Sequence, residues 1–258
     1  MDSLVFIDTH CHFDAAEFAL DRDSEYARAW AGGVSTQIIP AIAYQNFADV
    51  EAVCARYAGC LPAWGLHPML IAAHRDEHLA RLREQIERHR PVAIGEIGLD
   101  FFIRGLDPVT QEYFYVEQLK IAREYDLPVL LHCRKSVDQL LKHLRRIPVR
   151  GGIAHAFNGS SQQAEMLIKL GFKLGFGGAF TWPRANNLRR LAVSLPLESI
   201  VLETDSPDIP PVWIGKGRNS PAELPQIART LAELRGIAIA EVSEVTTANA
   251  SAVLSLNA

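Results

Sequence analysis

Eight short apolar runs, separated by polar segments, constrain the fold of this chain more than any other feature. Near-continuous apolar strands that alternate with helices are typical of a parallel sheet covered on both faces. A chain of 258 residues has room for eight such units. We therefore predict an α/β fold, a single (β/α)8 TIM barrel that spans residues 1–258 as one domain. The runs are SLVFIDTH (3–10), VSTQIIPAI (34–42), LPAWGLHP (61–68), PVAIGEIGLD (91–100), LPVLLHCR (127–134), GGIAHAFNG (151–159), FKLGFGGAF (172–180) and SIVLETDSP (199–207).

The segments between the runs carry helical signals. In DPVTQEYFYVEQLKIAREYD, Asp107 can cap a helix and Pro108 suits its first turn. Two further helices are predicted after the last run, around residues 222–235 and 241–254. A doubly wound open sheet is the alternative fold, but its first strand-to-helix turn would carry GxGxxG, and this chain has histidines there.

Composition and charge exclude some classes of protein. Apolar residues make up 48% of the chain, which is enough for a sizeable core. No apolar run is long enough to span a bilayer, and no basic region with an apolar signal core opens the chain, so we expect a cytoplasmic protein without membrane contact. The four cysteines form no CxxC pair and are expected to be reduced. The net charge of −4 means that nucleic-acid binding would need a local basic patch or metal ions.

Histidines gather at the carboxyl ends of the predicted strands, where barrel enzymes assemble their active sites. If residues 4–12 form a strand, Asp8, His10 and His12 project from one face. The histidines at strand ends are His10, His12, His67, His132 and His155. The remaining four lie in helical segments and are expected at the solvated surface: His74, His78, His89 and His143.

Two carboxylates join these histidines, Glu96 in GEIGLD and Asp205 in LETDSP. Neutral imidazoles and ionised carboxylates bind divalent transition metals, whereas Mg²⁺ prefers oxygen ligands. The six ligands His10, His12, Glu96, His132, His155 and Asp205 are too many for one ion with open positions. We predict two divalent ions, Mg, Mn or Zn, about 3.5–4 Å apart and bridged by a carboxylate. The alternatives are a structural salt bridge for Glu96 and a helix cap for Asp205.

Six motifs in fixed order, DTHCHFD, GLHP, GEIGLD, LLHCRK, AHAFNG and LETDSP, resemble the TatD family of metal-dependent nucleases, barrels of the amidohydrolase superfamily. The later segments are most similar to its YjjV-type branch. The resemblance implies that His10 and His12 bind one ion, that Glu96 is shared and that His132 and His155 bind the other. It also implies that Asp205 is a ligand that handles the proton of the attacking water.

Two positions depart from the pattern of that family. Many members have a second histidine after GxHP, where this chain has Met69, and many have an aromatic residue after ETDxP, where it has Asp208. The first departure leaves His67 as the sole imidazole of its loop. The second removes a surface on which a base could stack.

Hydrolysis of a phosphodiester, with DNA as substrate, is the predicted activity, and Asp205 and Glu96 are the predicted catalytic residues. Arg134 shares the face of His132 and is the first candidate for a phosphate contact, with His67 second; a rim salt bridge and a core or capping histidine are the alternatives. Glu203 is expected to accept a hydrogen bond from a metal-bound histidine, and Asp8 to play a similar part. We expect a monomer without an obligate protein partner.

Loops on the predicted catalytic face also carry basic and aromatic side chains, which are compatible with nucleic acid. They are Arg104, Lys135, Arg184, Lys216 and Arg218, with Phe101, Phe102, Phe157, Trp182 and Trp213. The glycines of the GFGG run at 175–178 are expected to make room beside the metals.

Two other functions fit the same residues. An amidohydrolase would use the activated water on a C–N or carboxylic ester bond. A non-catalytic binding protein would use the histidines and a metal only to stabilise the barrel.

Overall fold

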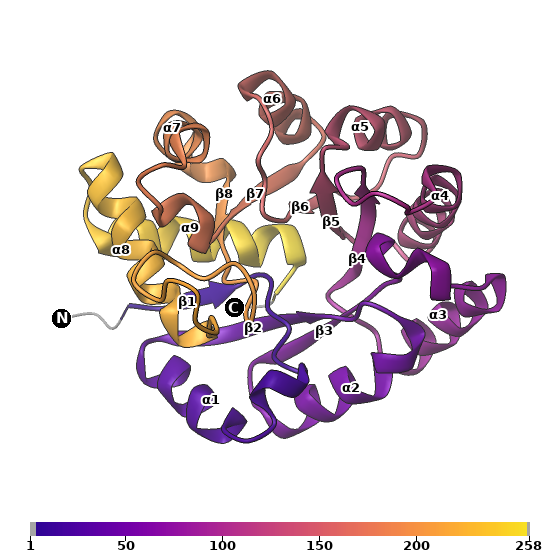
Figure 1. Ribbon diagram of the computed structural model, residues 1–258, viewed down its shortest axis with the longest axis horizontal. Coiled ribbons are helices and arrows are strands. Elements are labelled where there is room, and N and C mark those ends of the chain that lie inside the picture. The colour runs from indigo at the N-terminus through magenta and orange to yellow at the C-terminus, as the bar shows by residue number, and fades with distance from the viewer. Residues whose placement is uncertain (1–3, 257–258) are drawn as a thin grey trace.

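A computed structural model describes residues 4–256, so residues 1–3 and 257–258 of the predicted domain lie outside it. Eight strands, hydrogen-bonded in chain order and all parallel, form one sheet that curls into a nearly closed barrel (Figure 1). The predicted TIM barrel is therefore confirmed. The strands are β1 (Phe6–Asp8), β2 (Val34–Pro40), β3 (Cys60–Trp64), β4 (Ala93–Asp100), β5 (Val129–Arg134), β6 (Gly152–Ala154), β7 (Phe172–Phe176) and β8 (Ile200–Leu202).

Helices surround the barrel and cover the outer face of the sheet (Figure 1). The predicted start of α4 is confirmed, because Pro108 opens the helix and the Asp107 side chain accepts a hydrogen bond of 2.9 Å from the backbone N–H of Thr110. The helices are α1 (Arg22–Ala31), α2 (Phe47–Arg56), α3 (Asp76–Arg88), α4 (Pro108–Glu124), α5 (Val137–Arg146), α6 (Ser161–Lys169), α7 (Asn186–Ser194), α8 (Leu224–Arg235) and α9 (Ile239–Leu254). No helix in the described part of the chain is both long and apolar enough to cross a membrane.

Short contacts between β1 and β8 close the barrel. The backbone N–H of Thr9 donates to the carbonyl of Leu202 at 3.0 Å. Beyond the strands the seam continues, as Asp205 N–H donates to the carbonyl of His10 at 2.8 Å and His12 N–H donates to that of Ser206 at 2.7 Å. The chain segments that carry two histidines and a carboxylate are thus held side by side.

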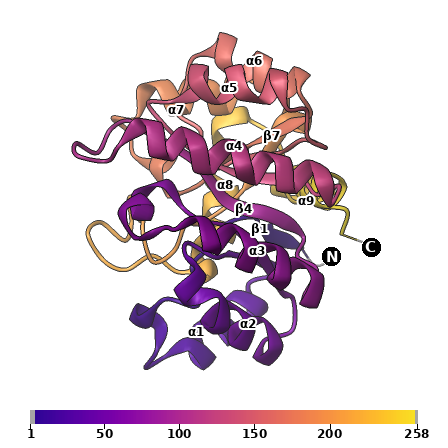
Figure 2. The ribbon, with the colours of Figure 1, turned by 90° about the vertical axis from the view of Figure 1, so that its right-hand side faces the viewer.

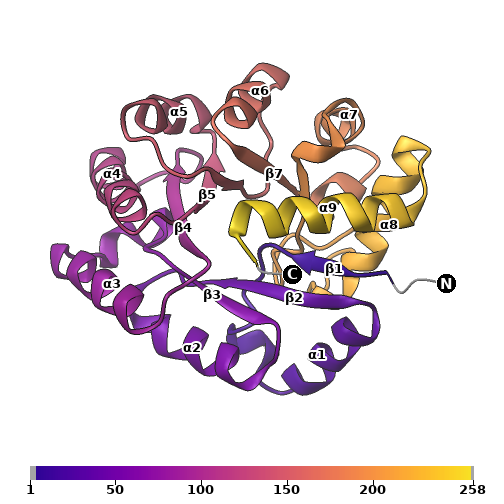
Figure 3. The same ribbon diagram turned by 180° about the vertical axis from the view of Figure 1, so that it is seen from behind.

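The interior of the barrel is packed with apolar side chains rather than open. The C-terminal helix α9 lies across the end where the strands begin (Figure 3), and its Ala250 and Leu254 pack against that interior. In the side view, both termini lie at this end, and the long loop between β8 and α8 projects from the opposite end (Figure 2). The carboxyl ends of the strands are therefore the end at which a barrel of this kind can assemble a site. The interior side chains are Ile7, Ile38, Ala63, Ala93, Leu130, Ile153 and Val201.

Two local predictions are wrong. The first strand ends at Asp8, so His10 and His12 lie in the segment after it and not on one strand face. His74 and His78 are buried and not solvated, with 4% and 7% of their surface exposed. The imidazole Nε2 of His74 lies 2.9 Å from the carbonyl of His67, so it helps to hold the β3–α3 loop.

Candidate metal centre

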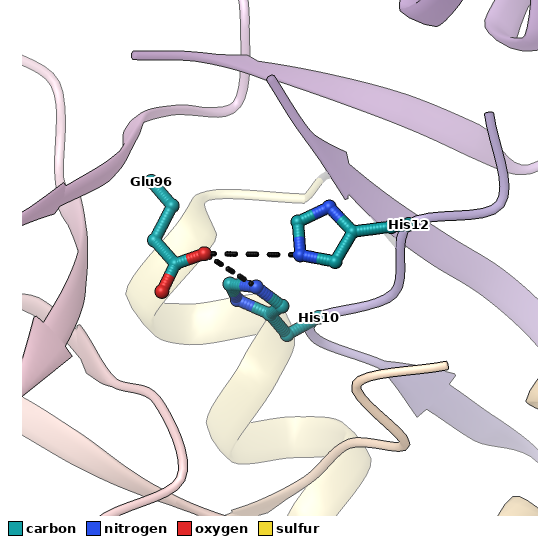
Figure 4. Close-up of side chains that lie close together, drawn as sticks. All are labelled: His10, His12 and Glu96. Carbon is teal, nitrogen blue, oxygen red and sulfur yellow. Dashed lines mark ion pairs between the residues drawn. The ribbon is translucent and has the colours of Figure 1, made fainter. Parts of the chain in front are cut away.

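Histidines from three parts of the chain converge on the buried carboxylate of Glu96, which lies within β4: His10 and His12 follow β1, His67 follows β3 and His132 lies in β5. Its Oε2 lies 3.1 Å from His10 Nε2 and 3.8 Å from His12 Nε2 (Figure 4). Its Oε1 lies 2.9 Å from His132 Nδ1 and 3.2 Å from His67 Nε2. Each oxygen of one carboxylate thus faces its own pair of imidazoles, so the two oxygens of Glu96 lie towards different ligand groups.

Asp205 faces the same cluster from the loop after β8. Its Oδ1 lies 3.4 Å from His155 Nε2 and 3.7 Å from both His10 Nε2 and His12 Nε2. The imidazoles of His10 and His155 stack with ring centroids 3.6 Å apart. His155 therefore lies with His10 and Asp205 rather than with His132, which differs from the division that the family resemblance implies.

Asp205 does not cap a helix. The next helical segment, the 3-10 helix η6 (Pro221–Glu223), begins far along the chain. Asp205 itself adopts a left-handed backbone conformation with φ of 57°. The helix-cap alternative is therefore wrong.

The residues present fit divalent ions, because buried ligand atoms in this cluster lack other partners. His10 Nε2 is buried and faces Glu96 Oε2 at 3.1 Å, yet among the described residues it makes no hydrogen bond of acceptable geometry. Three groups have potential ligand atoms that all lie within 4.8 Å of one another: His10, His12 and Glu96; His10, His155 and Asp205; and His67, Glu96 and His132.

Electrostatics keep the carboxylates of the cluster ionised. Burial raises the pKa of Glu96, but its interactions with His67 and His10 and its hydrogen bonds with His10 and His132 outweigh burial and leave that pKa well below its usual value. Burial also raises the pKa of Asp205, but its interactions with His155, His10 and His12 together lower it below its usual value. Both side chains are therefore available as anionic ligands.

Asp100, at the end of β4, is a site residue that the sequence analysis missed. Its Oδ2 lies 3.0 Å from His132 Nε2, and its Oδ1 accepts hydrogen bonds from the backbone N–H groups of Phe102 and Ile103. Burial lowers the pKa of His132, but the hydrogen bonds to Asp100 and Glu96 raise it to about 9. A carboxylate on Nε2 leaves Nδ1 to face the cluster, as in a metal-bound histidine with an outer partner. The sequence did carry an indication of Asp100. It is the last residue of GEIGLD and lies four residues after Glu96, so on one strand both side chains point to the same face.

His67 has a hydrogen bond that decides its tautomer. The backbone N–H of Met69 donates to His67 Nδ1 at 3.1 Å, where the imidazole caps the 3-10 helix η3 (Pro68–Ala73). A neutral imidazole that accepts at Nδ1 carries its proton on Nε2. The nitrogen that faces Glu96 is then a donor, which suits a carboxylate or a phosphoryl oxygen better than a metal ion.

Glu203 and Asp8 take different places beside the cluster. Glu203 Oε1 lies 3.0 Å from His155 Nδ1 and accepts a hydrogen bond of 2.6 Å from the backbone N–H of Ala156. Asp8 instead accepts hydrogen bonds from the backbone N–H of His10 and from the backbone N–H and hydroxyl of Thr204. Burial raises the pKa of Asp8 to about 7.

Gly175 in β7 leaves the space that Glu203 fills. A Cβ on Gly175 would lie 2.1 Å from Glu203 Oε2. The glycine of the GFGG run therefore makes room for a carboxylate beside the cluster rather than for the ions themselves.

A cleft of about 1160 Å³ opens above the cluster. Arg134 lines it, half-exposed, with its guanidinium 4.0 Å from Asp100 Oδ2. Of the loop residues that sequence placed on this face, Phe101, Phe102 and Lys135 line the cleft. Others are engaged elsewhere: Phe157 is fully buried, Arg218 pairs with Asp21, and the Trp213 indole donates to Glu223.

An eight-stranded parallel barrel with histidines and carboxylates gathered at the carboxyl ends of its strands defines the class of amidohydrolase-like, metal-dependent hydrolases. The family model described as TatD related DNase matches residues 7–255. The chain belongs to the TatD family and is a metal-dependent hydrolase.

Individual relatives agree with this assignment. The chain is 44% identical over 235 residues to the uncharacterized metal-dependent hydrolase YjjV of Escherichia coli K12, which covers 89% of this chain and 90% of that protein. It is 35% identical over 260 residues to the 3′-5′ ssDNA/RNA exonuclease TatD of Cronobacter sakazakii, and the alignment covers 97% of this chain and 98% of that protein. The crystal structure of the Escherichia coli YjjV protein has a TM-score of 0.94 to this chain at 41% identity and covers 98% of both chains.

Proposed function

We propose that this hydrolase cleaves phosphodiester bonds in DNA, with two divalent ions held between the histidines and carboxylates of the barrel mouth. The observation that carries the proposal is Glu96, whose two oxygens each face a separate pair of imidazoles. When bound, two such ions would supply an activated water and neutralise charge on the attacking and leaving oxygens. The nuclease names of the matching family and of the Cronobacter relative support the choice of bond.

The ligands fall into two sets around Glu96. We assign His10, His12 and Asp205 to one side and His132 to the other, with Glu96 shared. His155 Nε2 faces Asp205, so we place it as a ligand on the side of His10. Asp100 and Glu203 would orient His132 and His155 through their outer nitrogens.

Asp205 is the residue that we assign to the proton of the attacking water. Its side chain is 14% exposed and lines the cleft, so a water beside the cluster can reach it. Its lowered pKa keeps it a carboxylate at neutral pH, as a proton acceptor must be.

The phosphate would lie between His67 and Arg134, both of which line the cleft. His67 offers an Nε2 proton, and the Arg134 guanidinium offers a charge-assisted donor to a phosphoryl oxygen. These two donors are matched to the charge that develops during attack at phosphorus.

A substrate panel tests this proposal. Protein reconstituted with Mn²⁺ should release nucleotides from a short single-stranded DNA and cleave bis(p-nitrophenyl) phosphate, while amides, lactones and carboxylic esters stay intact. Chelated protein is the control. Hydrolysis of an amide or a lactone without release of nucleotides would instead favour an amidohydrolase. Metal-dependent melting without any turnover would favour a binding protein.

A further inference from the structure

One wall of the cleft is apolar and exposed. Met69, Leu70, Phe101 and Phe102 line it, and between 36% and 49% of their surface is accessible. They come from the two neighbouring loops after β3 and β4. Large apolar side chains that stay exposed inside a cleft indicate a surface that binds an apolar or planar group.

Two cations lie directly against this wall. The guanidinium carbon of Arg134 is 4.0 Å from the centroid of the Phe102 ring, and Lys135 Nζ is 5.0 Å from it. Arg134 is partly neutralised by Asp100. Lys135 is exposed, and within the described residues no carboxylate lies within ion-pair distance of its ammonium group. Its positive charge is therefore free to meet an anion.

The backbone holds Lys135 in place. It follows the last residue of β5 and adopts a left-handed conformation with φ of 55°, which is uncommon for a residue other than glycine. Such conformations persist where the surrounding structure enforces them, and they cluster at ligand-binding sites. The backbone conformation from which the Lys135 side chain extends is thus part of the fold.

The rest of the cleft mouth would repel a second phosphate. Glu17, Asp138 and Asp208 line it and bring negative charge. Among the cleft residues in the described chain, Arg134 and Lys135 are the only lysine or arginine side chains. A phosphate next to the one under attack therefore has a single favourable place, beside Phe102.

We propose that Phe102, Arg134 and Lys135 form a subsite for the nucleotide adjacent to the scissile bond. Its phosphate lies on Lys135, and its base packs on the exposed rings of Phe101 and Phe102, which replace the aromatic residue absent at Asp208. This inference rests on the proposed phosphodiesterase function. It specifies the substrate of that function as a nucleotide chain with at least two phosphates. A minimal diester would leave the subsite empty.

Kinetics with dinucleotides test the subsite. The reconstituted protein should cleave a thymidine dinucleotide that carries a terminal phosphate, at its 5′ or 3′ end, with a kcat/KM about tenfold or more above that of the dinucleotide without one. Lys135→Gln should abolish this preference by raising KM for the phosphorylated dinucleotide. For the unphosphorylated dinucleotide, kcat/KM should stay within about twofold of the parental value. Lys169→Gln, in the last turn of α6 and outside the cleft, is the matched control. A Lys135→Gln variant that keeps the preference, or loses activity equally on both substrates, overturns the subsite.

Binding separates failure of the subsite from failure of the proposed function. Calorimetry should show thymidine 3′,5′-bisphosphate, which contains no diester, binding about tenfold more weakly to Lys135→Gln than to the parent. Phe102→Leu should weaken the binding of the bisphosphate but not the binding of its abasic analogue. If no diester is cleaved but these differences hold, the subsite stands and the phosphodiesterase assignment fails. If diesters are cleaved and bisphosphate binding is the same in all variants, the subsite is wrong.

Discussion

An Asp205→Asn variant is expected to hydrolyse phosphodiesters about 100-fold or more slowly than the parent, while its melting temperature stays near the parental value. Asparagine keeps the shape and one oxygen but removes the charge and basicity that the attacking water needs. It also tolerates the left-handed backbone of this position as well as aspartate does. Steady-state kinetics and a thermal melt measure the two quantities on the same preparation.

The Asp205→Asn result is informative only if the ions remain bound. Elemental analysis of the variant should therefore accompany the kinetics. Turnover close to that of the parent, with both ions present, would show that Asp205 is a structural residue. A loss of turnover that follows a loss of metal would identify it as a metal ligand.

Glu96→Ala is expected to weaken the binding of both ions by more than about 100-fold. Loss of an outer partner alone commonly costs about 10–100-fold in affinity, and here the shared ligand itself is removed. His132→Ala, by contrast, should lower affinity mainly at one ion, because its Nδ1 faces only one oxygen of Glu96. Titration of chelator-stripped protein with a divalent ion gives both affinities.

Removal of Glu96 also leaves several buried imidazoles facing one another, so Glu96→Gln is the variant that better preserves packing. It should retain the fold and still lose tight binding at both positions. A glutamine variant that binds two ions with parental affinity would contradict the bridging role.

The positions of the strand-end residues could be predicted because a parallel barrel brings all its carboxyl ends to one rim. Local patterns were enough to place Glu96, His132 and Asp205 there, and they also predicted the Asp107 cap of α4. The alternation of side chains along a strand did not predict the orientation of His10, because β1 ends at Asp8. The backbone hydrogen bond between His10 and Asp205, in the loop after β8, holds this segment instead.

Contacts made across the sheet could not be found from one segment. Strand alternation places Asp100 on the same face as Glu96, but its contact with His132 is found only when β4 and β5 are paired, because the two residues lie on neighbouring strands. The tautomer of His67 depends on a hydrogen bond from Met69, which has no signature in the residue types. His74 and His78 are buried by packing of α3 and its preceding loop, which helical periodicity alone did not predict.

Titration of chelator-stripped protein with Mn²⁺, with bound metal and phosphodiester hydrolysis measured at each step, tests the central claim most directly. We expect no hydrolysis without metal, and activity that rises until a second equivalent is bound, because the two oxygens of Glu96 face two separate sets of imidazoles. Full activity in the absence of any divalent ion would contradict the account, as would saturated metal binding without phosphodiester turnover.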